Sequence, residues 1–266
     1  MTVAKKDPLK IFVPFVDKKM ATKCFSENQF LAQREVYLID NRDRSVGLPT
    51  LYNEILEENL SEDAWLFFVH EDFQVQGELF DTEDLAVDAI YGVFGLRMDG
   101  HNPVGFGRHR CSEKDGSSVL MVGLPVTSPK CVETLDCVAV LVHTRLFRER
   151  PGLRFDEALT FDLYAEDLCI NARENHGVSV IVLPLEFQHY SKGFVTERYW
   201  RGIEHLGKKY PDVGVAGSCS FIGGKAHELE AHFTYDIPAN RKKRRRREAW
   251  KARFRMNSWR IFRKRS

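Results

Sequence analysis

The chain has 266 residues, of which 43% are apolar and 12% aromatic. That is enough for one large α/β domain or two small ones, and it excludes a chain that is disordered throughout. No apolar stretch approaches the roughly 18 to 20 residues that cross a bilayer, and the N-terminus has no apolar signal core, so we expect a cytoplasmic protein. The six cysteines show no zinc-ligand spacing, which predicts reduced core thiols.

The net charge of +1 conceals two oppositely charged parts of the chain. Residues 241–266 hold fourteen Lys or Arg and one acid, a charge of +13, whereas the first 240 residues hold 25 bases and 37 acids, a charge of −12. Such a division indicates that the basic end has an anionic partner of its own. We therefore expect a folded domain over residues 1–235 and a basic, aromatic tail over residues 236–266, either helical or disordered.

Apolar runs predict the elements at the beginning of the domain. Strands are expected at residues 9–16, 35–40 and 64–69, and the helical segments between them at residues 18–33 and 50–59. Strands that alternate with helices predict a parallel sheet with right-handed crossovers. Ligands bind beyond the carboxyl ends of such strands. Several polar residues fall there: Asp40, Asn41, His70, Glu71 and Asp72.

The middle of the chain is more irregular. Further strands are expected at residues 89–96, 118–123, 137–143 and 178–184, and helices at residues 161–175 and 199–209. The segment 99–116 is rich in Gly, His and Arg, and it is predicted to be a loop that acts as a lid or faces an acceptor. The whole pattern predicts an α/β fold with a mixed, mainly parallel sheet flanked by helices.

Acidic residues directly after the apolar strand 64–69 are the clearest chemical signal. Burying two carboxylates beside such a strand costs several kcal/mol unless a cation or hydrogen bonds compensate. A divalent metal would do so, although a solvated turn explains the tripeptide 70–72 equally well. The separate His189 and the acidic residues within 162–167 favour the metal.

The order of these motifs resembles a known family. The succession runs through Tyr37-Leu-Ile-Asp40-Asn41, Tyr52-Asn53, Trp65 to Asp72, Leu135-Asp136, Phe155 to Cys169 and His189-Tyr-Ser191. It resembles the inverting family-2 glycosyltransferases of GT-A fold, and within them the streptomycin-biosynthesis-type glycosyltransferase-like domain, over residues 9–210. The resemblance implies a Rossmann-like sheet that binds a UDP-, GDP- or dTDP-sugar, with Mn²⁺ or Mg²⁺ at the diphosphate. It also implies transfer to a glycan or lipid-linked acceptor, in bacterial surface polysaccharide or glycoconjugate synthesis.

Site residues follow from the resemblance position by position. For donor binding it implies Asp40 and Asn41 at the base or ribose, Asn53 at the same edge, Glu71, and Asp136 at the sugar or acceptor. As metal ligands it implies Asp72 first and His189 second. It gives His70 less weight, because the family usually has an Asp at that position.

The catalytic base is implied within the helix at residues 161–175. The family places an acidic pair and a further Asp near its start, whereas Tyr164-Ala165 stands here at the place expected for that pair. We place Asp167 first as the base and Glu166 second. Both carboxylates would be ionised near a helix N-terminus, which is also an ordinary structural reason for acids there.

Three other classes remain as alternatives. A nucleic-acid-binding protein would use the run 241–247 and its neighbouring aromatics, but this explains the tail alone. A nucleotidyltransferase on a similar sheet lacks a Gly-rich phosphate loop here. A catalytically inactive glycosyltransferase-like module would explain the departures at His70 and Ala165.

The tail itself predicts peripheral attachment to the inner face of a membrane. Anionic lipid attracts each nearby Lys or Arg by about 1 kcal/mol, and aromatic side chains add interfacial burial. On a helical wheel the aromatics form an imperfect amphipathic face. The residues we assign to membrane contact are Arg244, Arg245, Trp250, Phe254 and Trp259.

Overall fold

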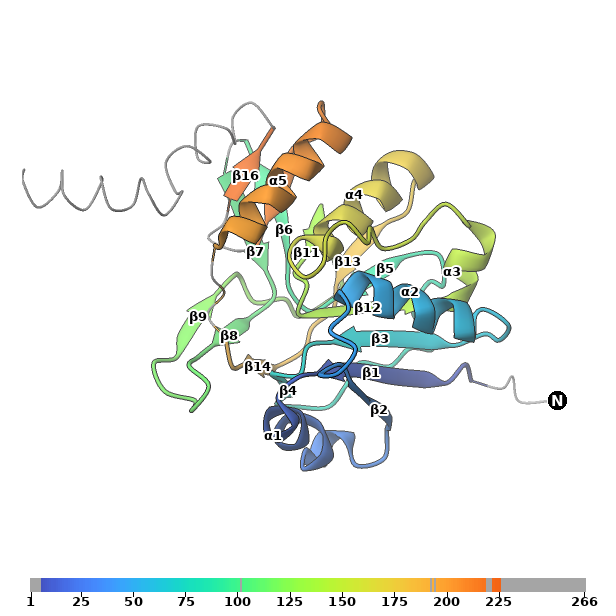
Figure 1. Ribbon diagram of the computed structural model, residues 1–266, viewed down its shortest axis with the longest axis vertical. Coiled ribbons are helices and arrows are strands. Elements are labelled where there is room, and N and C mark those ends of the chain that lie inside the picture. The colour runs from blue at the N-terminus through green and yellow to red at the C-terminus, as the bar shows by residue number, and fades with distance from the viewer. Residues whose placement is uncertain (1–5, 101, 192, 194, 219–221, 226–266) are drawn as a thin grey trace, which may run out of the picture.

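The computed structural model describes residues 6–100, 102–191, 193, 195–218 and 222–225 (Figure 1). The whole segment 236–266 and its predicted boundary lie outside the described residues. The residues predicted to contact a membrane therefore lie outside them too: Arg244, Arg245, Trp250, Phe254 and Trp259. Within the described part, no helix has the length and apolar character that a bilayer crossing needs.

A seven-stranded mixed sheet forms the centre of the domain, in the order β10-β13-β5-β12-β3-β1-β2. Five strands run in one direction, and β10 and β12 run the opposite way. The mixed, mainly parallel α/β architecture that the sequence predicts is therefore confirmed. The strands are β1 (Leu9–Phe15), β2 (Glu35–Asp40), β3 (Trp65–Val69), β5 (Ile90–Gly92), β10 (Lys130–Cys131), β12 (Ala139–His143) and β13 (Val180–Val182).

Both faces of this sheet are covered, which explains why its central strands are continuously apolar. All five residues of β3 and of β12 are buried. Side chains alternate between the faces, so Leu66 and Phe68 join one apolar cluster while Trp65, Phe67 and Val69 join the other.

Helices from different parts of the chain pack on the two faces. The first cluster includes residues of α2 (Leu48–Asn59), α3 (Thr144–Glu149), α4 (Tyr164–His176) and α5 (Glu197–Lys209). The second includes residues from the segment that begins with α1 (Lys18–Ala21). In Figure 1, α4 and α5 lie near the top of the view and α1 at the bottom, with β3 and β1 between them.

The predicted helix at residues 18–33 is broken into short pieces. A π-helical turn, Thr22–Ser26, follows α1, and a 3₁₀ turn, Gln29–Leu31, comes after it. Thr, Cys, Phe and Ser are weak helix formers, and the Asn28 side chain accepts from the Phe30 N–H at 3.0 Å to begin the new turn.

Smaller sheets are built from the middle of the chain. A four-stranded sheet has the order β4-β14-β8-β9, and a three-stranded sheet has the order β11-β6-β7. Two more strands, β15 and β16, pair with each other in an antiparallel sense. The bounds are β4 (Phe73–Val75), β6 (Gly95–Asp99), β7 (Asn102–Phe106), β8 (His109–Cys111), β9 (Leu120–Val122), β11 (Thr134–Leu135), β14 (Phe187–His189), β15 (Val215–Gly217) and β16 (Ile222–Gly224).

The prediction of a loop over residues 99–116 was wrong, because this segment supplies β7 and β8. Strands this short carry too few residues to show an alternating pattern. The chain passes from β7 to β8 through Gly107, whose φ of +96° suits glycine. A Cβ there would lie 2.2 Å from the Val93 carbonyl oxygen, so the turn depends on the missing side chain.

The cysteines are mostly where the sequence predicts them. Cys24, Cys111 and Cys169 are buried free thiols, and Cys137 is half-buried. Cys131 is exposed on the edge strand β10, so the prediction that it belongs to the core was wrong. Edge strands have one open side, and a short apolar run does not reveal it.

Candidate functional site

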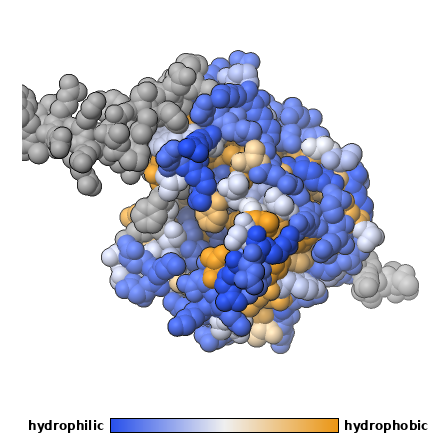
Figure 2. Space-filling view, in the orientation of Figure 1, coloured by the Kyte–Doolittle hydropathy of each residue, from blue (hydrophilic) through white to orange (hydrophobic). Residues whose placement is uncertain are grey.

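A cleft of about 650 Å³ lies at the carboxyl ends of β1 and β3. Figure 2 shows hydrophilic side chains over most of one face of the molecule, with apolar side chains reaching the surface near its middle. The cleft is lined by five carboxylates, and Arg198 is the one Lys or Arg among its described lining residues. These carboxylates are Glu71, Asp72, Asp136, Asp162 and Glu166. Such a wall repels a phosphate unless a cation intervenes.

Three side chains in the cleft could hold a metal ion. His70 follows β3, Asp72 lies two residues further on, and His189 ends β14; one ligand atom from each lies within 4.8 Å of the others. The Tyr190 N–H donates to the Asp72 carbonyl at 2.9 Å, which fixes the end of β14 against the turn after β3. The structure thus brings together all three residues that the resemblance assigns to the metal.

A hydrogen-bond chain orients His70. Tyr164 donates its hydroxyl proton to the Cys137 carbonyl oxygen at 2.6 Å, and the same hydroxyl lies 2.9 Å from His70 Nε2. Because the single hydroxyl proton is already used, His70 must donate from Nε2, which leaves Nδ1 with its lone pair. A histidine held in this way has one defined nitrogen for a metal.

Asp72 and His189 form a partly buried ion pair, with Oδ1 and Nε2 3.3 Å apart. Burial alone disfavours the charged form of either side chain. The attraction of the partner outweighs burial in both cases, so the pKa of Asp72 falls to about 2 and that of His189 rises to about 10. A cation that took the place of the His189 proton would meet a carboxylate already ionised.

Glu166 lies in the first turn of α4 and faces the cleft. Its side chain is buried, and burial, followed by the negative charge of Asp136, raises its pKa to about 8. The Cys137 thiol donates to Oε2 at 3.2 Å, and the Ser218 N–H and hydroxyl lie 3.4 Å from Oε1. Glu166 is therefore a carboxylate that can accept a proton near neutral pH.

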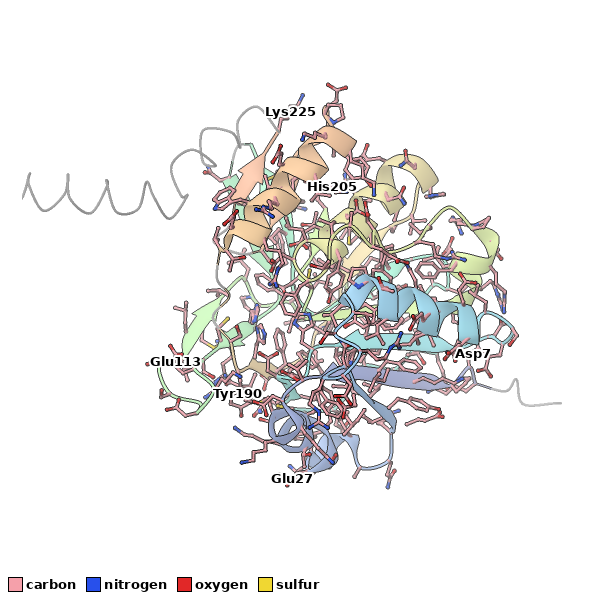
Figure 3. All side chains as sticks on the ribbon, viewed as in Figure 1. Asp7, Glu27, Glu113, Tyr190, His205 and Lys225 are labelled. Carbon is pink, nitrogen blue, oxygen red and sulfur yellow. The ribbon has the colours of Figure 1, made fainter. Side chains whose placement is uncertain are left out.

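Asp167 is equally buried but has a different environment. Lys209 of α5 donates to both of its oxygens, at 2.8 and 3.1 Å, and also reaches Asp156 at 2.7 Å. Asp156 accepts in addition from His205, which projects from α5 (Figure 3). Asp167 is not among the residues that line the cleft.

Two further acids line the cleft in fixed positions. Glu71 accepts from the backbone N–H groups of Val16 and Asp17, at 2.6 and 2.7 Å, and so holds the chain after β1. Asp136 accepts from the Val138 N–H at 2.8 Å. Burial would raise the pKa of Asp136, but His109 and His189 lower it, so this carboxylate is ionised.

The residues assigned to the nucleotide edge divide into two groups. Asn41 lines the cleft and closes its own loop through hydrogen bonds with the backbone of Val46. Asp40 is exposed and paired with Arg42. Asn53 binds the backbone of Phe155 and the carboxylate of Glu157, outside the cleft lining.

Sequence reasoning missed the cation of the cleft. Arg198 donates to Asp162 at 2.6 Å and stacks over the Phe161 ring at 4.6 Å. It stands two residues after Thr196, which caps α5 by accepting from the Tyr199 N–H at 3.3 Å. A cap motif shortly after His189 was the signal available, but nothing in the sequence distinguishes Arg198 from the other arginines on the surface.

The fold and the site together define a mixed α/β domain with a His-Asp-His cluster in a cleft at strand ends. No family model matches the sequence, and no curated protein matches it, so the streptomycin-type subgroup finds no support there. One solved structure that the chain resembles is "GalNAc-T7 with UDP, GalNAc and Mn2+", with a TM-score of 0.45 and 11% sequence identity. The alignment covers 79% of this chain and 50% of the other, so the chain spans about half the length of that protein.

Proposed function

We propose that the chain is a metal-dependent, inverting glycosyltransferase of GT-A fold that transfers a sugar from a UDP-, GDP- or dTDP-sugar to a hydroxyl group. The observation that carries this proposal is the placement of His70, Asp72 and His189 beside Glu166 in one cleft at the carboxyl ends of the strands. A charge-neutralising cluster and a proton acceptor are the two requirements of such a transfer.

The donor set fits a divalent cation that accepts both nitrogen and oxygen. One carboxylate and two imidazoles suit Mn²⁺ better than Mg²⁺, which prefers an all-oxygen shell. When bound, the ion would neutralise the charge that develops on the departing nucleoside diphosphate. Arg198 alone cannot do so, because Asp162 already pairs with it.

In this proposal Glu166, rather than Asp167, takes the proton of the acceptor hydroxyl. Glu166 lines the cleft and has a pKa of about 8, whereas Asp167 is bound to Lys209. A base of this pKa balances proton affinity against the fraction present as carboxylate. Asp136, on the same wall, is ionised and positioned to accept a hydrogen bond from the donor sugar or the acceptor.

The wall of the cleft at β9 supports an acceptor with an apolar part, such as a lipid-linked glycan. Leu120 and Phe161 line the cleft, yet 53% and 43% of their surfaces are exposed. Met121 and Leu124 nearby are also exposed. Exposed apolar side chains at the wall of a polar cleft are typical of a binding surface.

The experiment that tests the function is a screen of nucleotide sugars for stabilisation of the purified chain against heat, with and without Mn²⁺. A ligand that binds the native state stabilises it according to its occupancy. We expect one donor class to stabilise the protein only with Mn²⁺, and Asp72→Asn or His70→Gln to abolish that effect. Asp84→Asn, at an exposed residue outside the cleft lining, is the control. If Asp72→Asn binds donor and metal as well as the parent protein, the metal assignment is wrong.

The tail supports a peripheral position on the inner face of a membrane, where a lipid-linked acceptor would be present. The fourteen bases of residues 241–266 carry this part of the proposal. Deleting them should abolish sedimentation with anionic vesicles at low salt and leave donor binding intact. Equal sedimentation of the shortened chain would exclude the tail as the anchor.

A further inference from the structure

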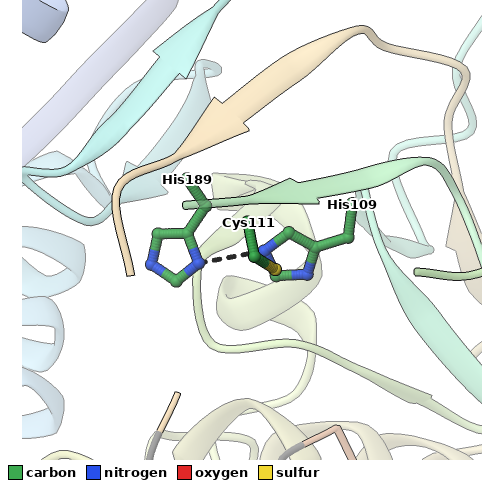
Figure 4. A group of neighbouring side chains, drawn as sticks. All are labelled: His109, Cys111 and His189. Atoms are coloured by element: carbon green, nitrogen blue, oxygen red, sulfur yellow. Dashed lines mark hydrogen bonds between the residues drawn. The ribbon is translucent and has the colours of Figure 1, made fainter. Parts of the chain in front are cut away.

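A second cluster lies beside the first, formed by His109, Cys111 and His189 (Figure 4). The strands β8 and β14 are parallel neighbours, and Cys111 is the register partner of His189. His109 lies two residues before Cys111, so both side chains project from the same face of β8. All three residues are buried.

The ligand atoms of this cluster are close enough to surround one ion. His109 Nε2 and His189 Nδ1 are 2.9 Å apart, and one ligand atom from each of the three residues lies within 4.8 Å of the others. Two nitrogens on a tetrahedral Zn²⁺ are about 3.3 Å apart, given Zn–N bonds of about 2.0 Å. The two rings therefore need to separate by only a few tenths of an ångström.

From this arrangement we propose that His109, Cys111 and His189 form a binding site for Zn²⁺, which shares His189 with the His70-Asp72-His189 cluster. Two imidazoles and a thiolate are ligands that select zinc over Mn²⁺ or Mg²⁺. Three protein ligands leave one coordination position, and His109 and Cys111 both line the cleft, so that position opens toward the cleft. The nearby Asp136 and Asp72 carboxylates add negative charge that stabilises a cation.

The two clusters compete for one side chain. His189 Nδ1 faces His109, and its Nε2 faces Asp72. A neutral imidazole has a single nitrogen lone pair, so His189 can complete one cluster at a time. Zinc bound to Cys111 thus removes a ligand from the other cluster, and Zn²⁺ should inhibit Mn²⁺-dependent transfer; this consequence alone rests on the proposed function.

The test uses Co²⁺ as a spectroscopic substitute for Zn²⁺ on the full-length chain, freed of metal by a chelator. A thiolate bound to Co²⁺ gives a near-ultraviolet charge-transfer band, which nitrogen and oxygen ligands do not give. We expect this band in the parent protein, its removal by one equivalent of Zn²⁺, and its complete loss in Cys111→Ser. His109→Gln should weaken Zn²⁺ binding roughly a hundredfold and provides a second variant should Cys111→Ser not fold.

Two controls separate this site from other sources of the signal. Cys131→Ser removes an exposed thiol and should keep the band. His70→Gln disrupts only the first cluster and should also keep it, whether or not the protein proves to be a transferase. Loss of the band in Cys131→Ser would overturn the proposal, and so would Co²⁺ binding to the parent protein without any thiolate band.

Discussion

The first turn of α4 presents two adjacent carboxylates in opposite environments. On the cleft side, the buried Glu166 forms no ion pair within the part of the chain that the structure describes, and its pKa rises to about 8. On the side facing α5, Asp167 is buried against Lys209, and the hydrogen bonds from that lysine limit the rise that burial causes in its pKa. Although the two side chains are equally buried, Glu166 can exchange a proton, whereas Asp167 joins α4 to α5 through an ion pair.

This contrast shows that the partner, and not burial, decides the role of a buried acid. Desolvation acts on both carboxylates in the same direction. A positive charge at hydrogen-bond distance partly offsets it for Asp167, whereas the charge of Asp136, which acts on Glu166, is negative. Four predictions test the contrast.

The largest expected effect is on catalysis. Glu166→Gln should lower the transfer rate by about 10² to 10⁴-fold, because the acceptor hydroxyl loses its proton acceptor, while donor affinity is retained. Asp167→Asn, the matched isosteric change on the adjacent residue, should keep most of the activity. Single-turnover transfer with each variant measures both. An inactive Asp167→Asn beside an active Glu166→Gln would exchange the two roles.

The next effect is on stability, where we expect the change at Asp167 to have a larger effect than the change at Glu166. Asp167→Ala should destabilise the fold by about 2 kcal/mol, since Lys209 loses a buried partner yet can still reach Asp156 and water. Glu166→Gln should cost nothing at neutral pH, because the parent side chain is largely protonated there. Urea unfolding of the two variants gives the comparison. Equal losses in both would mean that Glu166 also has a counter-charge.

The third effect is the pH dependence of the same two properties. Transfer should increase as pH rises toward about 8, because Glu166 must lose its proton to act as a base. Stability should change in the opposite sense. Between pH 4.5, the ordinary pKa of a glutamate, and about pH 8, Glu166 is protonated in the folded state but ionised in the unfolded state. The folded state therefore binds one more proton, and the free energy of unfolding falls as pH rises. In thermal melts, the melting temperature of Glu166→Gln relative to that of the parent protein should increase by several degrees between pH 5 and pH 8. A constant difference between them would show that Glu166 does not titrate in this range.

The smallest expected effect comes from Cys137, whose thiol donates to Glu166 at 3.2 Å. That hydrogen bond stabilises the carboxylate and lowers its pKa. Cys137→Ala should therefore move the pH profile of transfer upward by less than about one unit, with little change in the maximal rate. Cys169→Ala, a buried thiol on the same helix as Glu166, is the control and should leave the profile in place.

Much of the fold followed from local patterns in the sequence. The strands β1, β2, β3 and β12 and the helices α2, α4 and α5 lie within a few residues of their predicted places, because long apolar runs and helical periodicity are set by neighbouring residues. The strands β7 and β8, which belong to two different small sheets, were missed. Both are short, and β8 gains stability from β14, a partner distant in the chain.

The sequence by itself determined the acidic, metal-compatible chemistry at the strand ends and the division between an acidic body and a basic tail, because composition and strand order do not depend on packing. Only the tertiary structure decided that Glu166, and not Asp167, faces the cleft, and that Arg198 lines it. It also decided that Cys111 lies beside two histidines. These outcomes depend on contacts between segments far apart in the chain, and desolvation and pairing, which set the roles of charged groups, act through such contacts alone.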